Sequence, residues 1–290
     1  MSSDVARMVD ATRRITAFAE RPRRGPRLSP AAAVLGVHVE GPFLSPRCAG
    51  SHPVSHLLPP DTGVLRRLSD AGRVRTVTLA PERPAPLELI RTCAESGVVV
   101  SLGHRDAAAG QAGFAFAAGA TAVTHLFNAM PPLRARAGGL GGAALARAGV
   151  ALQLVADGVH VADPMLRLAF AAAPDRCSLV SDAIAAAAMA DGSYPLGDVT
   201  VGVARRGDGT LAGSAVGLAA GMAHLRGIGI STVEALAAVT RRPARVLGEL
   251  QIGRVGAGWP ASRLIVDEEL RIRRIVFEGH EIEPDPRIVC

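Results

Sequence analysis

The sequence Val-Val-Val-Ser-Leu-Gly-His at residues 98–104 is a short apolar run that ends in a histidine. The chain contains five more runs of this kind, each an apolar segment with a polar or charged residue at its end, separated by Ala- and Leu-rich segments of helical character. Nearly continuous apolar strands that alternate with helices predict a parallel sheet covered on both faces. The six runs are Val34–Glu40, Val74–Glu82, Val98–His104, Ala122–Asn128, Ala151–Asp157 and Cys177–Asp182.

The placement of the polar residues narrows this prediction to a barrel. They stand repeatedly at the C-terminal ends of the expected strands, and that end is the catalytic face of a β/α barrel. We therefore expect an α/β fold of the (β/α)8 type. Because only six strand candidates precede Ala183, this barrel would lack its first strands.

The segments on either side of the strands read differently. The first residues carry apolar side chains at helical spacing from Val5 to Phe18, which predicts an amphipathic helix. Ser231–Leu247 reads as one helix, with Ser231 as its N-cap and Glu234 completing a capping box. Short antiparallel strands are expected at Tyr194–Arg205 and Gly209–Ala212, around the turn at 206–209, and a closing hairpin at Leu264–Asp267 and Ile272–Glu278.

These expectations divide the chain into four parts. The closing hairpin belongs to a small remnant β-sandwich element beside the barrel. The parts are the incomplete barrel at 1–190, a β insertion at 191–214, the closing helices of the barrel at 215–250 and the C-terminal β element at 251–290.

Composition excludes several classes of protein. An apolar fraction of 49% in 290 residues supports a sizeable core. The formal net charge of +6 is carried by arginine alone, and the arginines are scattered without an aromatic stacking platform, which argues against nucleic-acid binding. The first twenty residues lack the apolar core of a signal peptide, and no apolar run is long enough to span a bilayer. Four widely spaced cysteines without a Cys-x-x-Cys pair predict free thiols and a cytoplasmic protein.

Three strand-end residues form a candidate metal site. Glu40, His104 and His125 each follow an apolar run, so they are expected on one face of the barrel. A lone histidine in such a place is more often structural, but two imidazoles and one carboxylate together leave zinc an open fourth position. We therefore expect one divalent metal ion, zinc. A carboxylated-lysine bridge between two metals is impossible, because the chain contains no lysine.

Other polar residues leave alternatives open. Asp182 ends the sixth run and could pass a proton from water to a leaving amine, or it could cap a helix. His52 and His160 could polarise a carbonyl or hold sugar hydroxyls, and either could instead lie in a solvated loop. His38 shares the face of Glu40, where it could lie behind the ligands or lower in the barrel.

Seven segments in order resemble the N-acetylglucosamine-6-phosphate deacetylase family of the amidohydrolase superfamily. They are Gly36–Leu44, Thr78–Glu82, Leu102–His104, Thr124–Met130, Ala156–His160, Ser181–Ala183 and Thr210–Ser214. The resemblance implies a metal-dependent hydrolase that converts N-acetylglucosamine 6-phosphate, a small-molecule sugar phosphate, to glucosamine 6-phosphate and acetate.

The resemblance also implies roles for individual residues. Glu40, His104 and His125 match metal ligands, Asp182 matches the catalytic acid/base, and His52 matches a histidine that polarises the acetyl carbonyl. His160 matches a residue that contacts the substrate, while Asn128 and Ala129 match the segment that receives the sugar phosphate. Arg136 matches an arginine that reaches the phosphate of a neighbouring subunit, which implies a homodimer.

The chain also departs from the family pattern. Relatives have further N-terminal residues that supply barrel strands and a metal-facing His-x-His pair, so a second metal site is not expected here. Two alternatives to an active enzyme of this specificity remain. One is a truncated, non-catalytic remnant or interaction module, and the other is a deacetylase for another N-acetyl hexosamine phosphate, such as the galactosamine isomer.

Overall fold

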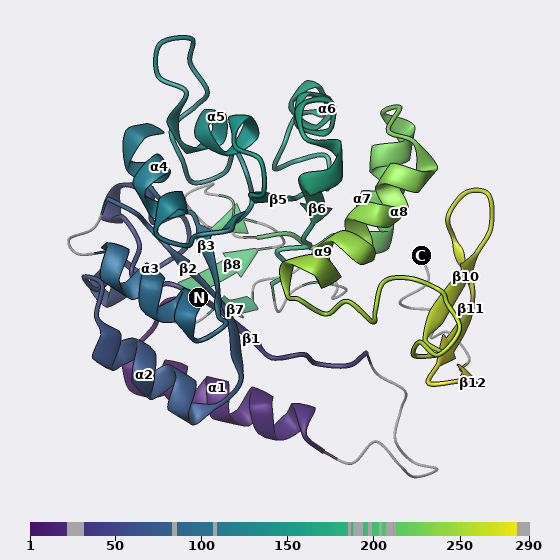
Figure 1. Ribbon diagram of the computed structural model, residues 1–290, viewed down its shortest axis with the longest axis horizontal. Coiled ribbons are helices and arrows are strands. Elements are labelled where there is room, and N and C mark those ends of the chain that lie inside the picture. Colours follow the sequence, from purple (N-terminus) through teal and green to yellow (C-terminus); the bar gives the residue numbers. More distant parts are fainter. Residues whose placement is uncertain are drawn as a thin grey trace. The chain divides into compact units, whose positions relative to one another are not determined.

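The computed structural model divides into two units. Their helices and strands are labelled in Figure 1. The first comprises Met1–Val150 with Gly197–Val199, and the second comprises Ala151–Leu196 with Thr200–Cys290. The structure describes residues 1–21, 32–82, 86–106, 109–184, 187, 194–196, 199–202, 205–206, 211 and 213–282.

The first unit is built on four parallel strands that pair in chain order, as predicted. The register pairs Glu40 with Thr78 and Leu79 with Leu102, so the C-terminal ends of these strands meet at one edge. The strands are β1 (Val37–Glu40), β2 (Val74–Leu79), β3 (Val99–Leu102) and β4 (Ala122–Val123). The helices are α1 (Val5–Ala19), α2 (Thr62–Ala71), α3 (Pro86–Glu95), α4 (Ala109–Ala117) and α5 (Gly139–Ala146), with 3-10 turns η1 (Pro46–Cys48) and η2 (Val54–His56).

The core of this unit lies between the strands and the helices that follow them. Val77, Leu79, Val100 and Leu102 are at most 1% exposed, as expected for strands covered on both faces. The predicted amphipathic N-terminal helix is confirmed as α1, whose N-cap Asp4 accepts a hydrogen bond from the Ala6 N–H.

Strand β4 is much shorter than the expected run Ala122–Asn128. It ends at Val123, because His125, Phe127 and Ala129 take positive φ angles of 28°, 79° and 47°. Residues in this left-handed region cannot continue a strand. The segment after β4 is therefore an irregular loop, and its second residue, His125, is a candidate ligand.

The second unit contains the parallel strands β5 (Ala151–Leu154) and β6 (Cys177–Leu179), which are the fifth and sixth expected runs. Helix α6 (Asp163–Ala172) and the turn η3 (Pro174–Arg176) connect them, and α7 (Leu218–Gly227) follows later in the chain. The expected hairpin near the C-terminus is confirmed as β10 (Arg263–Val266) and β11 (Ile272–Phe277), to which β12 (His280–Ile282) adds a third strand.

The expected β insertion is present in part. The single strand expected at Tyr194–Arg205 is divided in the structure. Strands β7 (Tyr194–Leu196), β8 (Val199–Gly202) and β9 (Arg205–Arg206) form a three-stranded sheet, with β8 and β9 antiparallel, so Arg206 lies in a strand and not in the expected turn. The turn predicted at 206–209 and the strand predicted at Gly209–Ala212 lie mostly outside the described residues.

The single helix predicted at Ser231–Leu247 is wrong: the structure has two, α8 (Thr232–Val239) and α9 (Arg241–Val246). Pro243 explains the break, because it lacks an N–H and its ring clashes with the carbonyl four residues earlier. Ser231 is the N-cap as predicted, and its hydroxyl accepts from the Glu234 N–H. The Glu234 carboxylate, however, pairs with buried Arg242.

This ion pair predicts a stability effect. Arg242 is 2% exposed and also donates to the carbonyls of Cys177 and Glu234. Glu234→Ala would leave a buried cation without its carboxylate, so we expect a loss of about 3 kcal/mol in the free energy of unfolding. Ser231→Ala removes only the cap and should cost about 1 kcal/mol. Urea unfolding of both variants checks this, and equal losses would contradict the assigned role of the pair.

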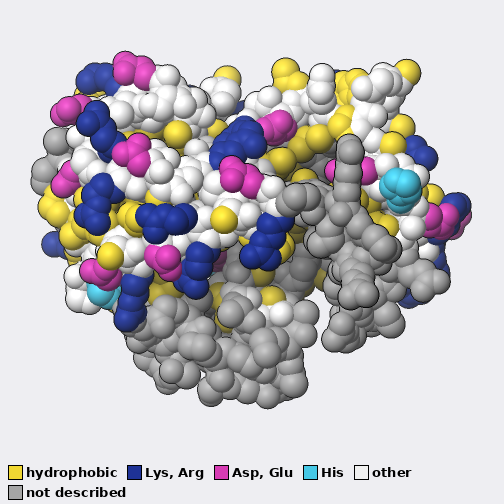
Figure 2. Space-filling view, turned by 90° about the horizontal axis from the view of Figure 1, so that it is seen from below, with side chains coloured by type: hydrophobic (Ala, Val, Ile, Leu, Met, Phe, Trp, Pro, Cys, Tyr) yellow, Lys and Arg dark blue, Asp and Glu magenta, His cyan; other side chains and the backbone are white. Residues whose placement is uncertain are grey.

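The visible surface carries charges of both signs. Figure 2 shows arginine side chains interspersed with carboxylates rather than gathered in one patch. Exposed arginine–carboxylate pairs occur at Arg14–Asp10 and Arg274–Glu281. In the part of the chain that the structure describes, no helix combines the length and apolarity needed to cross a membrane.

Candidate metal centre

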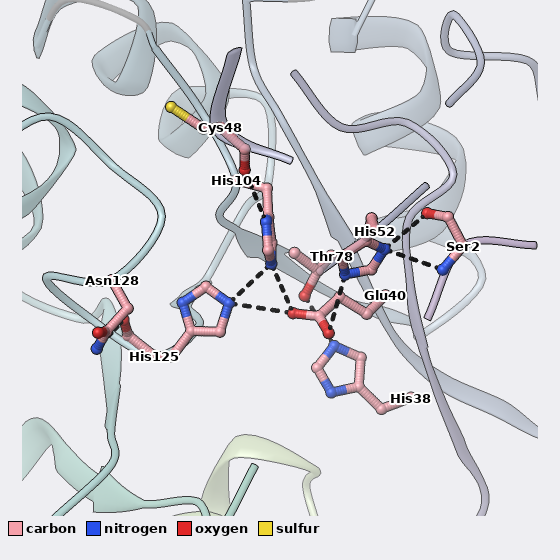
Figure 3. A network of polar contacts seen from close by, with 9 residues as sticks. All are labelled: Ser2, His38, Glu40, Cys48, His52, Thr78, His104, His125 and Asn128. Atoms are coloured by element: carbon pink, nitrogen blue, oxygen red, sulfur yellow. Dashed lines mark hydrogen bonds and ion pairs between the residues drawn. The ribbon is translucent and has the colours of Figure 1, made fainter. Parts of the chain in front are cut away.

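The predicted ligands Glu40, His104 and His125 meet at the C-terminal edge of the first unit's strands (Figure 3). Glu40 is the last residue of β1, and the histidines lie two residues beyond the ends of β3 and β4. Their ligand atoms all lie within 4.8 Å of one another. The structure thus brings together the three residues that the sequence singled out.

The contacts within this cluster are close. Nε2 of His125 lies 3.1 Å from Oε1 of Glu40 and 3.0 Å from Nε2 of His104. Nε2 of His104 lies 3.3 Å from the same carboxylate oxygen. Both imidazoles are nearly inaccessible, whereas the Glu40 side chain is 19% exposed. The open side of the cluster therefore lies at the carboxylate.

The Cys48 carbonyl orients His104. It lies 2.9 Å from His104 Nδ1. A carbonyl can only accept, so Nδ1 carries the proton and Nε2 presents its lone pair to the cluster. A backbone carbonyl on the outer nitrogen is a common partner for a metal-binding histidine, because it fixes both ring orientation and tautomer.

The donor set fits a divalent metal ion. A proton on His125 Nε2 could serve Glu40 and His104 together, but it would leave the His104 lone pair facing a carboxylate oxygen 3.3 Å away. A cation among the three groups satisfies every lone pair at once. A tetrahedral zinc ion with bonds of about 2.0–2.1 Å places its ligand atoms about 3.3–3.4 Å apart, close to the spacing observed.

Electrostatics keep Glu40 ionised. Burial on its own would raise the pKa of this carboxyl group. The neighbouring imidazoles of His104, His125 and His52 outweigh burial and hold the pKa of Glu40 well below its usual value. The cluster therefore offers an anionic oxygen to a cation at neutral pH.

His52 contributes a donor to the same cluster. The Ser2 N–H donates to His52 Nδ1 at 2.9 Å, and the Ser2 hydroxyl lies at the same distance from that nitrogen. Since Nδ1 accepts, neutral His52 carries its proton on Nε2, which points at Glu40 Oε2 3.5 Å away (Figure 3). Burial is the main cause that lowers the pKa of His52, although Glu40 opposes it. His52 is thus a neutral N–H donor at the edge of the cluster.

His38 does not join the ligands. Its side chain is exposed, and its Nε2 lies 2.7 Å from the Thr78 hydroxyl on β2. This placement contradicts a position lower in the barrel. The hydrogen bond ties β1 to β2 beside Glu40, since Thr78 is the register partner of Glu40.

Backbone strain gathers around the candidate residues. Among described non-glycine residues, seven have positive φ, and five of them are His104, His125, Phe127, Ala129 and Asp182. Such conformations cost about 1–3 kcal/mol each and cluster at functional sites. The strain marks the same loops that the sequence singled out.

Asn128 and Ala129 lie in the strained loop after His125. The Asn128 side-chain amide donates to the His125 carbonyl at 3.3 Å, and the Ala129 carbonyl accepts from the Arg105 N–H at 3.1 Å. Arg136 is exposed in the turn closed by the Arg134–Ala137 bridge. The Arg136 side chain is therefore accessible to another molecule.

His160 and Asp182 belong to the second unit. His160 Nδ1 lies 2.7 Å from Oδ2 of Asp157, and Ser214 Oγ donates to the same oxygen at 2.8 Å. The main chain of Asp182 accepts from the Ser214 N–H at 2.8 Å. The sequence reading missed Asp157 and Ser214 as site residues, although each stood within a quoted segment and Asp157 ended an expected strand.

Metal binding gives a first prediction for this centre. At a Zn²⁺ concentration of about 100 times the dissociation constant, binding to the folded state should add about 2.7 kcal/mol to the free energy of unfolding. Thermal unfolding with Zn²⁺ and with a chelator measures this gain. His104→Ala should abolish it, whereas His56→Ala, which leaves the cluster intact, should retain it. A shift that survives in His104→Ala would place the metal elsewhere.

Asp157 gives a pH prediction. Burial opposes ionisation, but the backbone N–H groups of His160 and Val159 and the side chains of Ser214 and His160 lower the pKa of Asp157 from 3.8 to about 2. A depressed folded-state pKa stabilises the fold above the unfolded value, and this gain is lost as the pH falls from about 4 towards 2. The stability gap between the parent and Asp157→Asn should therefore shrink by about 2 kcal/mol over this window. Urea titrations measure the gap, and a constant gap would contradict the assignment.

Sequence comparisons connect this chain with characterised enzymes. The Amidohydrolase family model matches residues 18–286. The N-acetylglucosamine-6-phosphate deacetylase of Bacillus subtilis (strain 168) is 35% identical over 258 residues, which cover 86% of this chain and 65% of the relative. The N-acetylgalactosamine-6-phosphate deacetylase of Escherichia coli O157:H7 is 35% identical over 270 residues, which cover 90% and 71%. The chain spans about two thirds of the length of the curated relatives it matches.

Solved structures extend this likeness to the fold. The N-acetylglucosamine-6-phosphate deacetylase of Thermotoga maritima matches with a TM-score of 0.89 at 30% identity, covering 98% of this chain and 77% of that one. A mutant Mycobacterium smegmatis enzyme in complex with N-acetyl-D-glucosamine-6-phosphate matches with a TM-score of 0.87 at 33% identity, covering 97% and 74%. These matches confirm the predicted parallel α/β fold of barrel type.

Proposed function

The chain belongs to the amidohydrolase family, among the N-acetylglucosamine-6-phosphate deacetylases, and from this premise we propose that it hydrolyses N-acetylglucosamine 6-phosphate to glucosamine 6-phosphate and acetate. The observation that carries the proposal is the convergence of Glu40, His104 and His125 at the strand ends. The close spacing of these donor atoms and the ionised state of Glu40 support a hydrolytic metal centre over a non-catalytic remnant.

The proposed cofactor is a single zinc ion held by these three residues. Two imidazole nitrogens and one carboxylate oxygen form a set that zinc accepts while keeping one position open. Such an ion supplies Lewis acidity and lowers the pKa of water in the site. His104 enters this role with its lone pair already directed by the Cys48 carbonyl.

Within the chemistry, His52 is proposed to bind the acetyl carbonyl oxygen. Its Nε2–H is directed by the hydrogen bond from Ser2 and lies at the open, carboxylate side of the cluster. A preset donor of this kind stabilises the negative charge that develops on a carbonyl oxygen during attack.

Asp182 is proposed to move the proton. It would take a proton from the attacking water and deliver it to the departing amine, as its place in the segment Ser181–Ala183 implies. The role of Asp182 is proposed from its place in the segment Ser181–Ala183, whereas the metal ligands are proposed from the distances between their atoms.

The substrate's other groups need their own partners. Asn128 and Ala129 are proposed to receive the phosphate, and His160 to contact the sugar. Arg136 would reach the phosphate bound by a second copy, in a homodimer, and its exposure supports such a role. The three described cysteines are free thiols, which suits the cytoplasmic location that we propose.

Product analysis tests the proposal. The purified, metal-loaded chain should release acetate and glucosamine 6-phosphate in equal amounts from N-acetylglucosamine 6-phosphate. N-Acetylglucosamine without phosphate should be a much poorer substrate, because the phosphate contacts are lost. Equal rates on both sugars would contradict the proposed phosphate-binding residues. No acetate release from either sugar would contradict the proposed deacetylase activity.

A second substrate is favoured by one relative. The Escherichia coli N-acetylgalactosamine-6-phosphate deacetylase matches this chain at the same identity as the Bacillus subtilis enzyme. The two substrates differ only at C4, so a comparison of kcat/KM for the two sugar phosphates decides between them. A higher value for the galactosamine isomer would transfer the proposal to that substrate.

A further inference from the structure

One buried residue in the second unit, Ser214, contacts two segments that the proposed chemistry uses. It is 0% exposed, and its Oγ donates to Oδ2 of Asp157 at 2.8 Å while accepting from the Val216 N–H at 3.0 Å. Its main-chain N–H donates to the Asp182 carbonyl at 2.8 Å, and its own carbonyl accepts from the Ile184 N–H at 3.3 Å. The side chain and the backbone of Ser214 thus serve different neighbours.

The side chain completes the environment of Asp157. Oδ1 of Asp157 accepts from the backbone N–H groups of Val159 and His160, at 3.0 and 2.9 Å. Oδ2 accepts from the Ser214 hydroxyl and from Nδ1 of His160. Because an ionised carboxylate can only accept, His160 carries its proton on Nδ1 and presents the lone pair of Nε2 to a ligand. The hydroxyl of Ser214 therefore helps to fix which face of His160 a substrate meets.

The backbone completes the Asp182 turn. Asp182 has φ of +50°, and the next residue, Ala183, forms a parallel bridge with Ser214. Gly213 allows this close approach: it has φ of +83°, and a Cβ placed there would lie 2.6 Å from the Asp182 carbonyl oxygen and 2.7 Å from Cγ2 of Ile184. Gly213 and Ser214 thus pack directly against the strained turn, and there is no room for a side chain at Gly213.

We propose that Ser214 is a positioning residue of the deacetylase, which orients His160 through Asp157 with its side chain and fixes the Asp182 turn with its backbone. The inference rests on the proposed function for its kinetic consequences. Its structural content, the orientation of His160 and of the turn, stands apart from that function and can be measured separately.

The side-chain contact and the backbone contact predict effects on different kinetic constants. Ser214→Ala removes only the hydroxyl, so KM should rise about tenfold, the scale of one lost hydrogen bond to a charged group, while kcat changes less than about threefold. Gly213→Ala displaces the Asp182 turn, so kcat should fall more than about tenfold with a smaller change in KM. A matched control is Ser101→Ala, because Ser101 is equally buried and its hydroxyl has no hydrogen-bond partner among the described residues. It should leave both constants within about twofold.

Nitrogen-15 NMR of the imidazoles tests the positioning without any turnover. The Nδ1–H of His160, assigned by its loss in His160→Gln, should exchange slowly with solvent in the parent and much faster in Ser214→Ala. This result, together with an inactive parent, would uphold the positioning role while sinking the proposed function. A folded Ser214→Ala protein with unchanged Nδ1–H exchange and unchanged KM would overturn the inference. The inference would also be overturned if Ser214→Ala and Gly213→Ala changed kcat by the same factor and KM by the same factor. Both variants would then report a general loss of packing around the site.

Discussion

Asp182→Asn is expected to lower kcat for acetate release by about a thousandfold or more. The carboxamide has the shape of the carboxylate but cannot take a proton from water or deliver one to the departing amine. Proposed acid/base residues of this kind contribute about 10²–10⁴-fold, and Asp182 is assigned both transfers, which places the expected loss in the upper part of that range. Steady-state kinetics with the metal-loaded variant measures the loss.

The variant is a fair test because its backbone should survive. Asp182 has φ of +50°, a conformation that asparagine tolerates as well as aspartate. The contact with Ser214 uses the Asp182 carbonyl, which the substitution leaves in place. Metal content and the circular dichroism spectrum should therefore match those of the parent. A folded, metal-loaded Asp182→Asn protein that keeps a tenth of the parental kcat would remove Asp182 from the chemistry.

Glu40→Gln is expected to weaken zinc affinity by more than about a hundredfold and to abolish turnover at equimolar metal. Glu40 supplies the only anionic atom of the donor set, and its oxygen contacts both histidines. Loss of a hydrogen-bond partner of a metal ligand already costs about 10–100-fold in metal affinity, so the loss of a ligand charge should cost more. Competition with a chromogenic chelator measures the affinity.

A neighbouring carboxylate provides the control. Glu82 follows β2 and accepts from the Asp106 N–H at 2.5 Å, outside the ligand cluster. Glu82→Gln should therefore bind zinc as the parent does, even if the fold is less stable. If Glu40→Gln bound zinc within threefold of the parent, the metal site would have been misassigned.

The sequence predicted that the three candidate ligands would lie together, and it did so for a physical reason. Strand ends of a parallel sheet meet at one edge, so polar residues that end successive apolar runs must lie together. Glu40, His104 and His125 follow this rule, and all six expected strands are present. A short stretch of sequence contains both the strand and the residue that ends it. The sequence alone was therefore enough to predict that these residues cluster.

Contacts between distant segments escaped that reading. Ser2 and His52 are 50 residues apart, and Asp157 and Ser214 are 57 apart, without any periodic signal that joins them. A serine hydroxyl has no sequence pattern that predicts its partner. The break between α8 and α9 was different, because Pro243 was visible in the sequence and its effect on the preceding turn was underestimated.

The length of β4 was overestimated beside the candidate ligand His125. The run Ala122–Asn128 is apolar enough for a strand, yet the strand stops at Val123 because the residues around His125 adopt left-handed conformations. Local propensity could not predict this, since the strain is imposed by the tertiary structure around the site.

Titration of the metal-free chain with Zn²⁺, followed by acetate release from N-acetylglucosamine 6-phosphate, tests the central claim most directly. A single-metal centre built from Glu40, His104 and His125 predicts that turnover rises linearly with added zinc and saturates at one equivalent per chain. A folded chain that binds one equivalent without releasing acetate, or that needs two equivalents for turnover, would contradict the account.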